Sequence, residues 1–77
     1  MEIHISLRLF ADLSDRLPEN HDRFAVSSGT TVGKVLASLG ITEEEARLVF
    51  VNNRRAEPTT VLKDGDRLGA FPPVGGG

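Results

Sequence analysis

Alternation of apolar and polar residues at the start of the chain limits its fold more than any other feature. Ile3, Ile5, Leu7 and Leu9 occupy every second position, with polar residues between them. Because successive side chains of a β-strand point to opposite faces, this pattern predicts a strand over residues 2–10 with one buried face. Such a strand requires neighbouring strands and an apolar layer over that face. The chain is therefore expected to build a sheet that is covered on one side.

A helix is predicted in the middle of the chain, because apolar residues recur at helical spacing between residues 32 and 39. Thr30 or Thr31 is the expected N-cap, since a threonine hydroxyl can accept a hydrogen bond from a backbone N–H of the first turn. Gly40 is the expected end of the helix. The apolar stripe consists of Val32, Val35, Leu36 and Leu39. This stripe can supply the layer over the sheet.

Further strands are predicted at residues 23–27, 48–52 and 67–71, and we expect the second of these to be central. Residues 11–17 form either two helical turns or an irregular loop, and residues 53–57 turn back with room for a short strand.

The remaining connections have their own signals. Thr42 is expected to cap a short turn that begins with three glutamates. Val61 and Leu62 are expected to return to the core, and Lys63-Asp64-Gly65-Asp66 is a strong turn signal before the last strand.

The order of these elements predicts one α+β domain, in which a mixed sheet packs on one main helix. With the first and last strands paired in parallel through a right-handed crossover, the arrangement is the β-grasp, or ubiquitin-like, fold. A chain of 77 residues has room for a single domain at most. We place the β-grasp domain at residues 1–71 and a flexible tail that ends in Gly-Gly at residues 72–77.

Composition narrows the possible functions. The chain has no cysteine, which removes disulfides, thiolate metal sites and a cysteine nucleophile. A net charge of −2 argues against nucleic-acid binding, and no apolar run has the roughly 20 residues of a membrane helix. His4 and His21 have no spacing that supports a metal site. We expect a cytoplasmic carrier or binding protein with no metal and no bound cofactor of its own.

The C-terminal end carries the most distinctive chemistry. Phe71 ends the last strand, Pro72 and Pro73 favour an extended path, and residues 75–77 are all glycine. Without Cβ atoms the glycines can thread a narrow channel, which leaves the final carboxylate unhindered. A carboxylate becomes reactive when a partner enzyme attaches AMP to it, and the chain itself has no phosphate-binding loop. From the residues alone, an inert frayed tail stays open as the other interpretation.

Several short motifs accompany this tail. They are Ile5 to Ala11, Thr30-Thr31-Val32, Val51-Asn52, Asp64-Gly65-Asp66, and Phe71-Pro72-Pro73-Val74 before Gly76-Gly77. With these motifs, essentially the whole chain resembles the MoaD/ThiS family of ubiquitin-like sulfur carriers. It is most similar to the MoaD type, the small subunit of molybdopterin synthase. Thiamine-type carriers share the fold and the diglycine but usually lack the Phe-Pro-Pro-Val run.

The resemblance implies a function for the tail. Gly77 would be adenylated by a MoeB-like, E1-type enzyme that uses ATP and would then become a thiocarboxylate, with Gly75 and Gly76 giving access. The tail would enter a MoaE-like large subunit and donate sulfur for the molybdenum or tungsten cofactor. The chain would be a non-catalytic subunit of a heterotetramer with the large subunit. Whether the isolated chain is a monomer stays open.

The surface around the tail is expected to bind these partners. Phe10 and Phe71 should lie near each other, either in an apolar docking patch or in the core. The patch would continue through Pro72, Pro73 and Val74.

Two departures from the family pattern bear on the choice of partner. Arg55 stands where MoaD-type proteins often have an apolar residue, and Gly75 extends the diglycine to three glycines. Other clients therefore stay open, namely thiamine thiazole, tRNA thiolation, cysteine synthesis and protein conjugation, as does an inert β-grasp interaction module.

Overall fold

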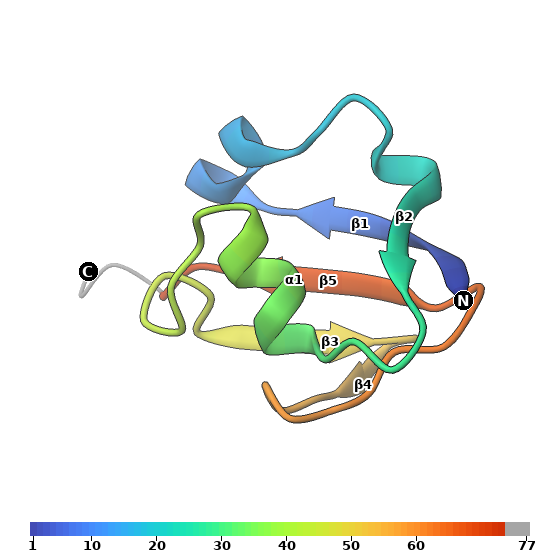
Figure 1. Ribbon diagram of the computed structural model, residues 1–77. Coiled ribbons are helices and arrows are strands. Elements are labelled where there is room, and N and C mark those ends of the chain that lie inside the picture. The colour runs from blue at the N-terminus through green and yellow to red at the C-terminus, as the bar shows by residue number, and fades with distance from the viewer. Residues whose placement is uncertain (74–77) are drawn as a thin grey trace.

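A five-stranded mixed sheet with one α-helix on one face forms the body of the molecule (Figure 1). The computed structural model describes residues 1–73, so the predictions for Val74, Gly75, Gly76 and Gly77 lie outside the described residues. The strand order is β2-β1-β5-β3-β4. The strands are β1 (Glu2–Leu9), β2 (Phe24–Ser27), β3 (Leu48–Val51), β4 (Arg54–Arg55) and β5 (Arg67–Phe71). The predicted strands and the β-grasp fold are confirmed.

Parallel pairing of the first and last strands organises the sheet, as predicted. Leu7 of β1 lies opposite Leu68 of β5, and Leu9 lies opposite Ala70. Leu68 and Ala70 are fully buried. The strand β3, expected to be central, lies inside the sheet between β5 and β4, but β5 takes the middle position. The apolar face of β1 forms the core with β5 and the helix, as the alternation predicted.

The helix α1 (Val32–Ser38) crosses one face of the sheet (Figure 1). The side-chain oxygen of Thr31 accepts a hydrogen bond from the backbone N–H of Lys34 at 3.3 Å, so Thr31 is the N-cap. The helix ends before Gly40, whose φ of 77° turns the chain away from the helical path. The backbone N–H of Ile41 then donates to the carbonyl of Leu36 and closes the last turn. With seven residues, α1 is shorter than the main helix that the sequence predicted. No helix of residues 1–73 is long and apolar enough to span a membrane.

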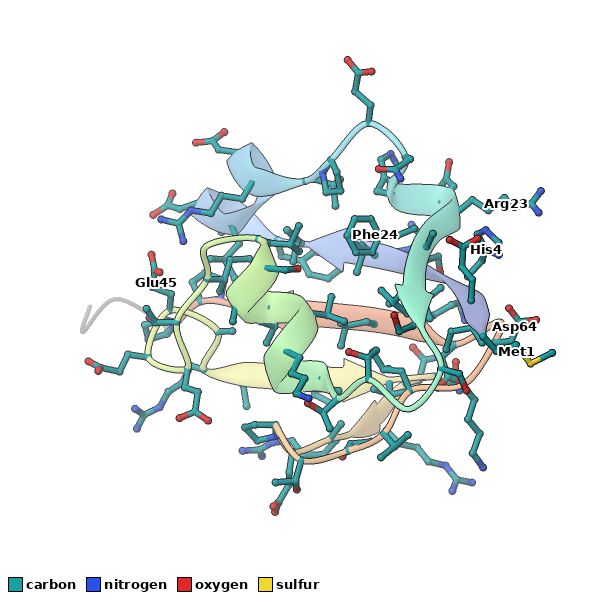
Figure 2. The ribbon with its side chains drawn as sticks, in the orientation of Figure 1. Met1, His4, Arg23, Phe24, Glu45 and Asp64 are labelled. Atoms are coloured by element: carbon teal, nitrogen blue, oxygen red, sulfur yellow. The ribbon has the colours of Figure 1, made fainter. Side chains whose placement is uncertain are left out.

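Two 3-10 helices complete the layer, η1 (Ala11–Arg16) and η2 (His21–Arg23). The guanidinium of Arg16 contacts the carboxylate of Glu45 at 2.8 Å and donates a hydrogen bond to the carbonyl of Gly40. Glu45 also accepts a hydrogen bond from the backbone N–H of Thr42, whose hydroxyl oxygen accepts one from Glu45 N–H. This reciprocal pair is the capping turn predicted at Thr42. Figure 2 shows Glu45 at the end of the molecule remote from His4 and Asp64.

The prediction that Val61 returns to the core together with Leu62 is wrong. Leu62 is 2% exposed, whereas Val61 is 51% exposed. Val61 forms an isolated bridge with Thr31, and the backbone N–H of Leu62 donates to the carbonyl of Thr30. In such an extended segment two successive side chains point to opposite sides, so only one of them can reach the core.

The substitution Leu68→Ala should lower the free energy of unfolding by about 2–5 kcal/mol, because it opens a cavity beside the middle strand. The matched variant Val61→Ala removes exposed carbon atoms and should change it by no more than about 0.5 kcal/mol. Urea denaturation followed by circular dichroism measures both. Equal losses in the two variants would contradict the described core.

The interactions of Glu45 predict acid-sensitive stability. The hydrogen bond from Arg16, with a smaller contribution from Thr42 N–H, lowers the pKa of the Glu45 carboxyl from 4.5 to about 2. The folded state therefore favours the charged form, and this contribution is present above the unfolded pKa and is lost as the pH falls toward 2. The variant Glu45→Gln should be less stable than the wild type at pH 7, and the difference should shrink between pH 5 and about 2. Urea denaturation at each pH measures it, and a difference that does not change with pH would contradict this role.

Candidate functional site

The face of the sheet opposite α1 presents a row of side-chain positions that crosses four strands. Arg8 of β1 lies opposite Gly69 of β5, and Gly69 lies opposite Phe50 of β3. Arg55 of β4 is next in the row, opposite Phe50. In Figure 1 this open face is turned away from the viewer, because α1 crosses in front of the strands.

Three phenylalanines gather on this face. The rings of Phe10 and Phe71 stack in parallel with their centroids 4.2 Å apart, and Phe50 meets Phe71 edge to face at 5.8 Å. The expected proximity of Phe10 and Phe71 is therefore confirmed. Phe10 is 39% exposed, while Phe50 and Phe71 are half-buried. The rings thus form an accessible aromatic surface outside the core, and their role in docking stays a prediction.

Local backbone geometry holds Phe10 in place. The backbone N–H of Phe10 donates to the carbonyl of Ala70, which extends the pairing of β1 with β5 by one residue. Ala11 then takes a positive φ of 52°, which is uncommon for a residue with a Cβ. The chain therefore leaves the sheet directly after Phe10 and enters η1, and the Phe10 ring stays over Phe71.

A shallow hollow of about 410 Å³ lies beside these rings. Three aromatic rings, a glycine of β5 and two arginines are among the residues that line it. Its lining residues are Arg8, Phe10, Phe50, Asn53, Arg67, Leu68, Gly69 and Phe71. Sequence reasoning did not single out four of these residues, because the register between strands decides which side chains lie together. They are Arg8, Phe50, Arg67 and Gly69.

Arg55 lies on the short edge strand β4 and is exposed, as expected for a residue that could meet a partner. A tight hairpin positions it: Asn52 and Asn53 both have positive φ, at 54° and 69°. The side-chain amide of Asn52 donates to the Asp66 carboxylate at 2.9 Å, and its oxygen accepts from Arg67 N–H at 3.0 Å. These bonds tie the hairpin to the turn before β5. The role of Arg55 in partner binding stays a prediction.

The middle strand leads straight into the tail. β5 ends at Phe71, followed by half-buried Pro72 and exposed Pro73. The tail thus departs beside the aromatic surface. The proposed functional end, Val74 to Gly77, lies outside the described residues, and the domain boundary at residue 71 stays a prediction.

The two histidines each lie near a different carboxylate. His4 is 3.7 Å from Glu2, and His21 is 3.2 Å from Asp22. Within residues 1–73, no three His, Cys, Asp or Glu side chains form a group that could hold a metal ion.

Several solved structures have the same fold as this chain. The Haloferax volcanii HVO 2177 protein is 27% identical with a TM-score of 0.73, over 99% of this chain and 88% of that one. SAMP1 of the same organism, small archaeal modifier protein 1, is 29% identical with a TM-score of 0.67, over 96% and 99% of the two chains. A chain in the complex of subunits 1 and 2 of molybdopterin-converting factor from Helicobacter pylori 26695 is 24% identical with a TM-score of 0.51, over 100% of both.

No curated protein matches the chain. The family model for the ThiS family matches residues 7–77, which is nearly the whole sequence. This match includes both the β-grasp body and the glycine tail. The chain therefore belongs to the ThiS family of ubiquitin-like sulfur carriers.

Proposed function

We propose that this chain carries sulfur as a thiocarboxylate on Gly77 and is the small subunit of a molybdopterin synthase. The observation that carries the proposal is the ThiS family match, which continues through Gly76 to Gly77. The position of β5 supports it, since the middle strand of the sheet leads directly to Pro72 and the tail. A folded domain whose sequence ends in residues without side chains suits a group that must enter the active sites of other proteins.

The proposed chemistry takes place on the Gly77 carboxyl carbon. A carboxylate oxygen attacks the α-phosphorus of ATP in an E1-type enzyme, and pyrophosphate leaves. The terminal sulfur of a persulfide then attacks the acyl adenylate, and AMP leaves. A thiol reduces the resulting acyl disulfide, which releases the thiocarboxylate. Gly75 and Gly76 carry no Cβ, so their backbone fits a channel that would exclude larger residues.

Partner proteins supply the catalytic side chains in this proposal. The exposed ring of Phe10, stacked on Phe71, offers an apolar anchor beside the departing tail. Pro72 and Pro73, followed by Val74, would hold the tail extended between this anchor and the reactive end. Arg55 offers a charged contact at the adjacent hairpin.

The molybdopterin client is favoured by the Phe-Pro-Pro-Val run before the glycines, which is a MoaD-type feature. The Helicobacter pylori structure contains subunits 1 and 2 of molybdopterin-converting factor together. By analogy, we propose a large, MoaE-like subunit as the acceptor of the tail.

A second candidate function is protein modification. It is favoured by the likeness to SAMP1, which at 29% exceeds the 24% identity to the molybdopterin-converting factor chain. In this case an amine of a target protein would attack the Gly77 adenylate, AMP would leave, and an isopeptide bond would form in place of the thiocarboxylate.

Incubation with ATP, a sulfur donor and the E1-type enzyme of the same organism should raise the intact mass by about 16 Da. Oxidation of Met1 gives the same nominal increase, so fragmentation must place the sulfur on Gly77. A variant that lacks Gly77 should keep its thermal unfolding midpoint and gain no sulfur. Sulfur uptake by that variant, or an unmodified wild type beside an enzyme shown to be active, would contradict the proposed function.

The client can be tested with the same thiocarboxylated protein. It is mixed with the MoaE-like subunit of the same organism and the cyclic pyranopterin precursor. The thiocarboxylate should return to the carboxylate as molybdopterin forms. Fluorescence of the oxidised pterin measures the product. The form with an unmodified carboxylate is the matched control. Formation of stable conjugates in cell extract without pterin product would favour the modifier function instead.

A further inference from the structure

The strand β2 forms one edge of the sheet and lacks the usual protection of an edge. Its residues, Phe24–Ser27, include no charged side chain and no proline. Natural sheets commonly keep their edges from pairing with other chains by means of charges, prolines or very short strands. The opposite edge follows this rule, because β4 consists of Arg54 and Arg55 alone. β2 is therefore the edge at which another strand can be added.

The pairing of β2 with β1 decides which backbone groups of β2 point to this open edge. Ala25 lies opposite His4. The N–H of His4 donates to the Asp64 carboxylate at 2.9 Å, and its carbonyl accepts from Gly65 N–H at 2.8 Å. Both groups of His4 thus face away from β2, and the hydrogen-bonded pairs between the two strands are the neighbouring ones. The N–H and the carbonyl of Ala25 consequently point away from β1, to the open edge.

Two further backbone groups reach the same edge. Ser27 N–H points outward by the same alternation. The Arg23 carbonyl points outward because the N–H across its trans peptide bond faces β1. The other groups of these two residues are used within the chain, since Arg23 N–H donates to Asn20 and the Ser27 carbonyl accepts from Thr30 N–H. In the described part of the chain, the free edge therefore consists of the N–H groups of Ala25 and Ser27 and the carbonyls of Arg23 and Ala25.

We propose that β2 pairs with β2 of a second copy of this chain, antiparallel, about a twofold axis at Ala25. Each Ala25 N–H then donates to the Ala25 carbonyl of the other copy, and each Ser27 N–H donates to the Arg23 carbonyl of the other copy. Every free group of the edge is paired, and the groups already used within each chain face one another. A shift by two residues in either direction loses half of these hydrogen bonds, because it places a used group opposite a free one.

The side chains fit the same register. Phe24 of each copy lies opposite Val26 of the other, and an aromatic ring beside a β-branched side chain is a favourable cross-strand pair. Both residues are half-buried against the core of the single chain, so the second copy can cover apolar surface that is still exposed. On the other face Ala25 meets its own copy, and Arg23 lies opposite Ser27. No like charges therefore face each other directly across the axis.

This dimer leaves the proposed function intact, and the inference does not rest on that function. β1 separates β2 from β5 in the sheet, so Phe71 and the start of the tail at Pro72 belong to a strand that the second copy does not pair with. Figure 1 shows β2 on the right and the red end of β5 on the left. A dimer through β2 would thus present two tails that are both free to meet other proteins.

Substitutions at the axis test the dimer. Ala25→Lys and Ala25→Glu each place like charges opposite one another, and both should keep the thermal unfolding midpoint because Ala25 is exposed. Ala37→Lys and Ala37→Glu are the matched controls, since Ala37 is an exposed alanine on α1. Sedimentation equilibrium at protein concentrations up to about 1 mM measures the dimer Kd. Amide hydrogen exchange followed by NMR locates the contact.

We expect the mass of the wild type to rise with concentration from that of one chain toward that of two, while exchange at the amides of Ala25 and Ser27 slows. Ala25→Lys or Ala25→Glu alone should raise the dimer Kd at least about fivefold. An equimolar mixture of these two variants should bind at least as tightly as the wild type, because opposite charges then meet across the axis. The Ala37 variants, alone or mixed, should stay within about twofold of the wild type.

A wild type that remains a single chain at the highest concentration would overturn the inference. So would slower exchange confined to the aromatic surface, or equal effects of the substitutions at Ala25 and Ala37. Pairing of β2 with a strand of a different protein, while the chain alone stays a monomer, would also show that the second copy is the wrong occupant.

Discussion

Pairing of β1 with β5 is the interaction on which the rest of the structure depends. It joins the first strand to the last, and the sheet grows outward from this pair, with β2 beside β1 and with β3 and then β4 on the side of β5. The pairing places Leu68 and Ala70 under α1, where they are fully buried. On the other face the same register places Arg8 beside Gly69. The core and the aromatic surface thus lie on the two sides of one set of backbone hydrogen bonds.

Much of the fold could be predicted because the signals are local. The alternation in residues 2–10 reports which face of β1 is buried, and the cap at Thr31 reports where α1 begins. Relations between strands are not local, since alternation does not say which residue of a neighbouring strand lies alongside. The proximity of Phe10 and Phe71 was predictable once the end strands were paired, whereas the stacking of their rings and the place of Phe50 beside Gly69 were not.

Fold and partner choice are separated in this molecule. The β-grasp body and the glycine tail are common to the ThiS family, and they account for a sulfur carrier in general. The groups that the open face presents add little to the core. Arg8 and Arg67 are exposed, and Phe10 lies outside the core cluster. Such residues can differ between relatives without loss of the fold.

The place of β5 in the sheet has a mechanical consequence. A partner that draws the tail into a channel pulls on the C-terminal end of β5, along the strand axis. β5 is held by β1 on one side and β3 on the other, so the hydrogen bonds on both sides are loaded in shear and share the force. An edge strand would instead be held on one side only. In the proposed function, the tail is thus attached to a strand that has hydrogen-bonded partners on both sides.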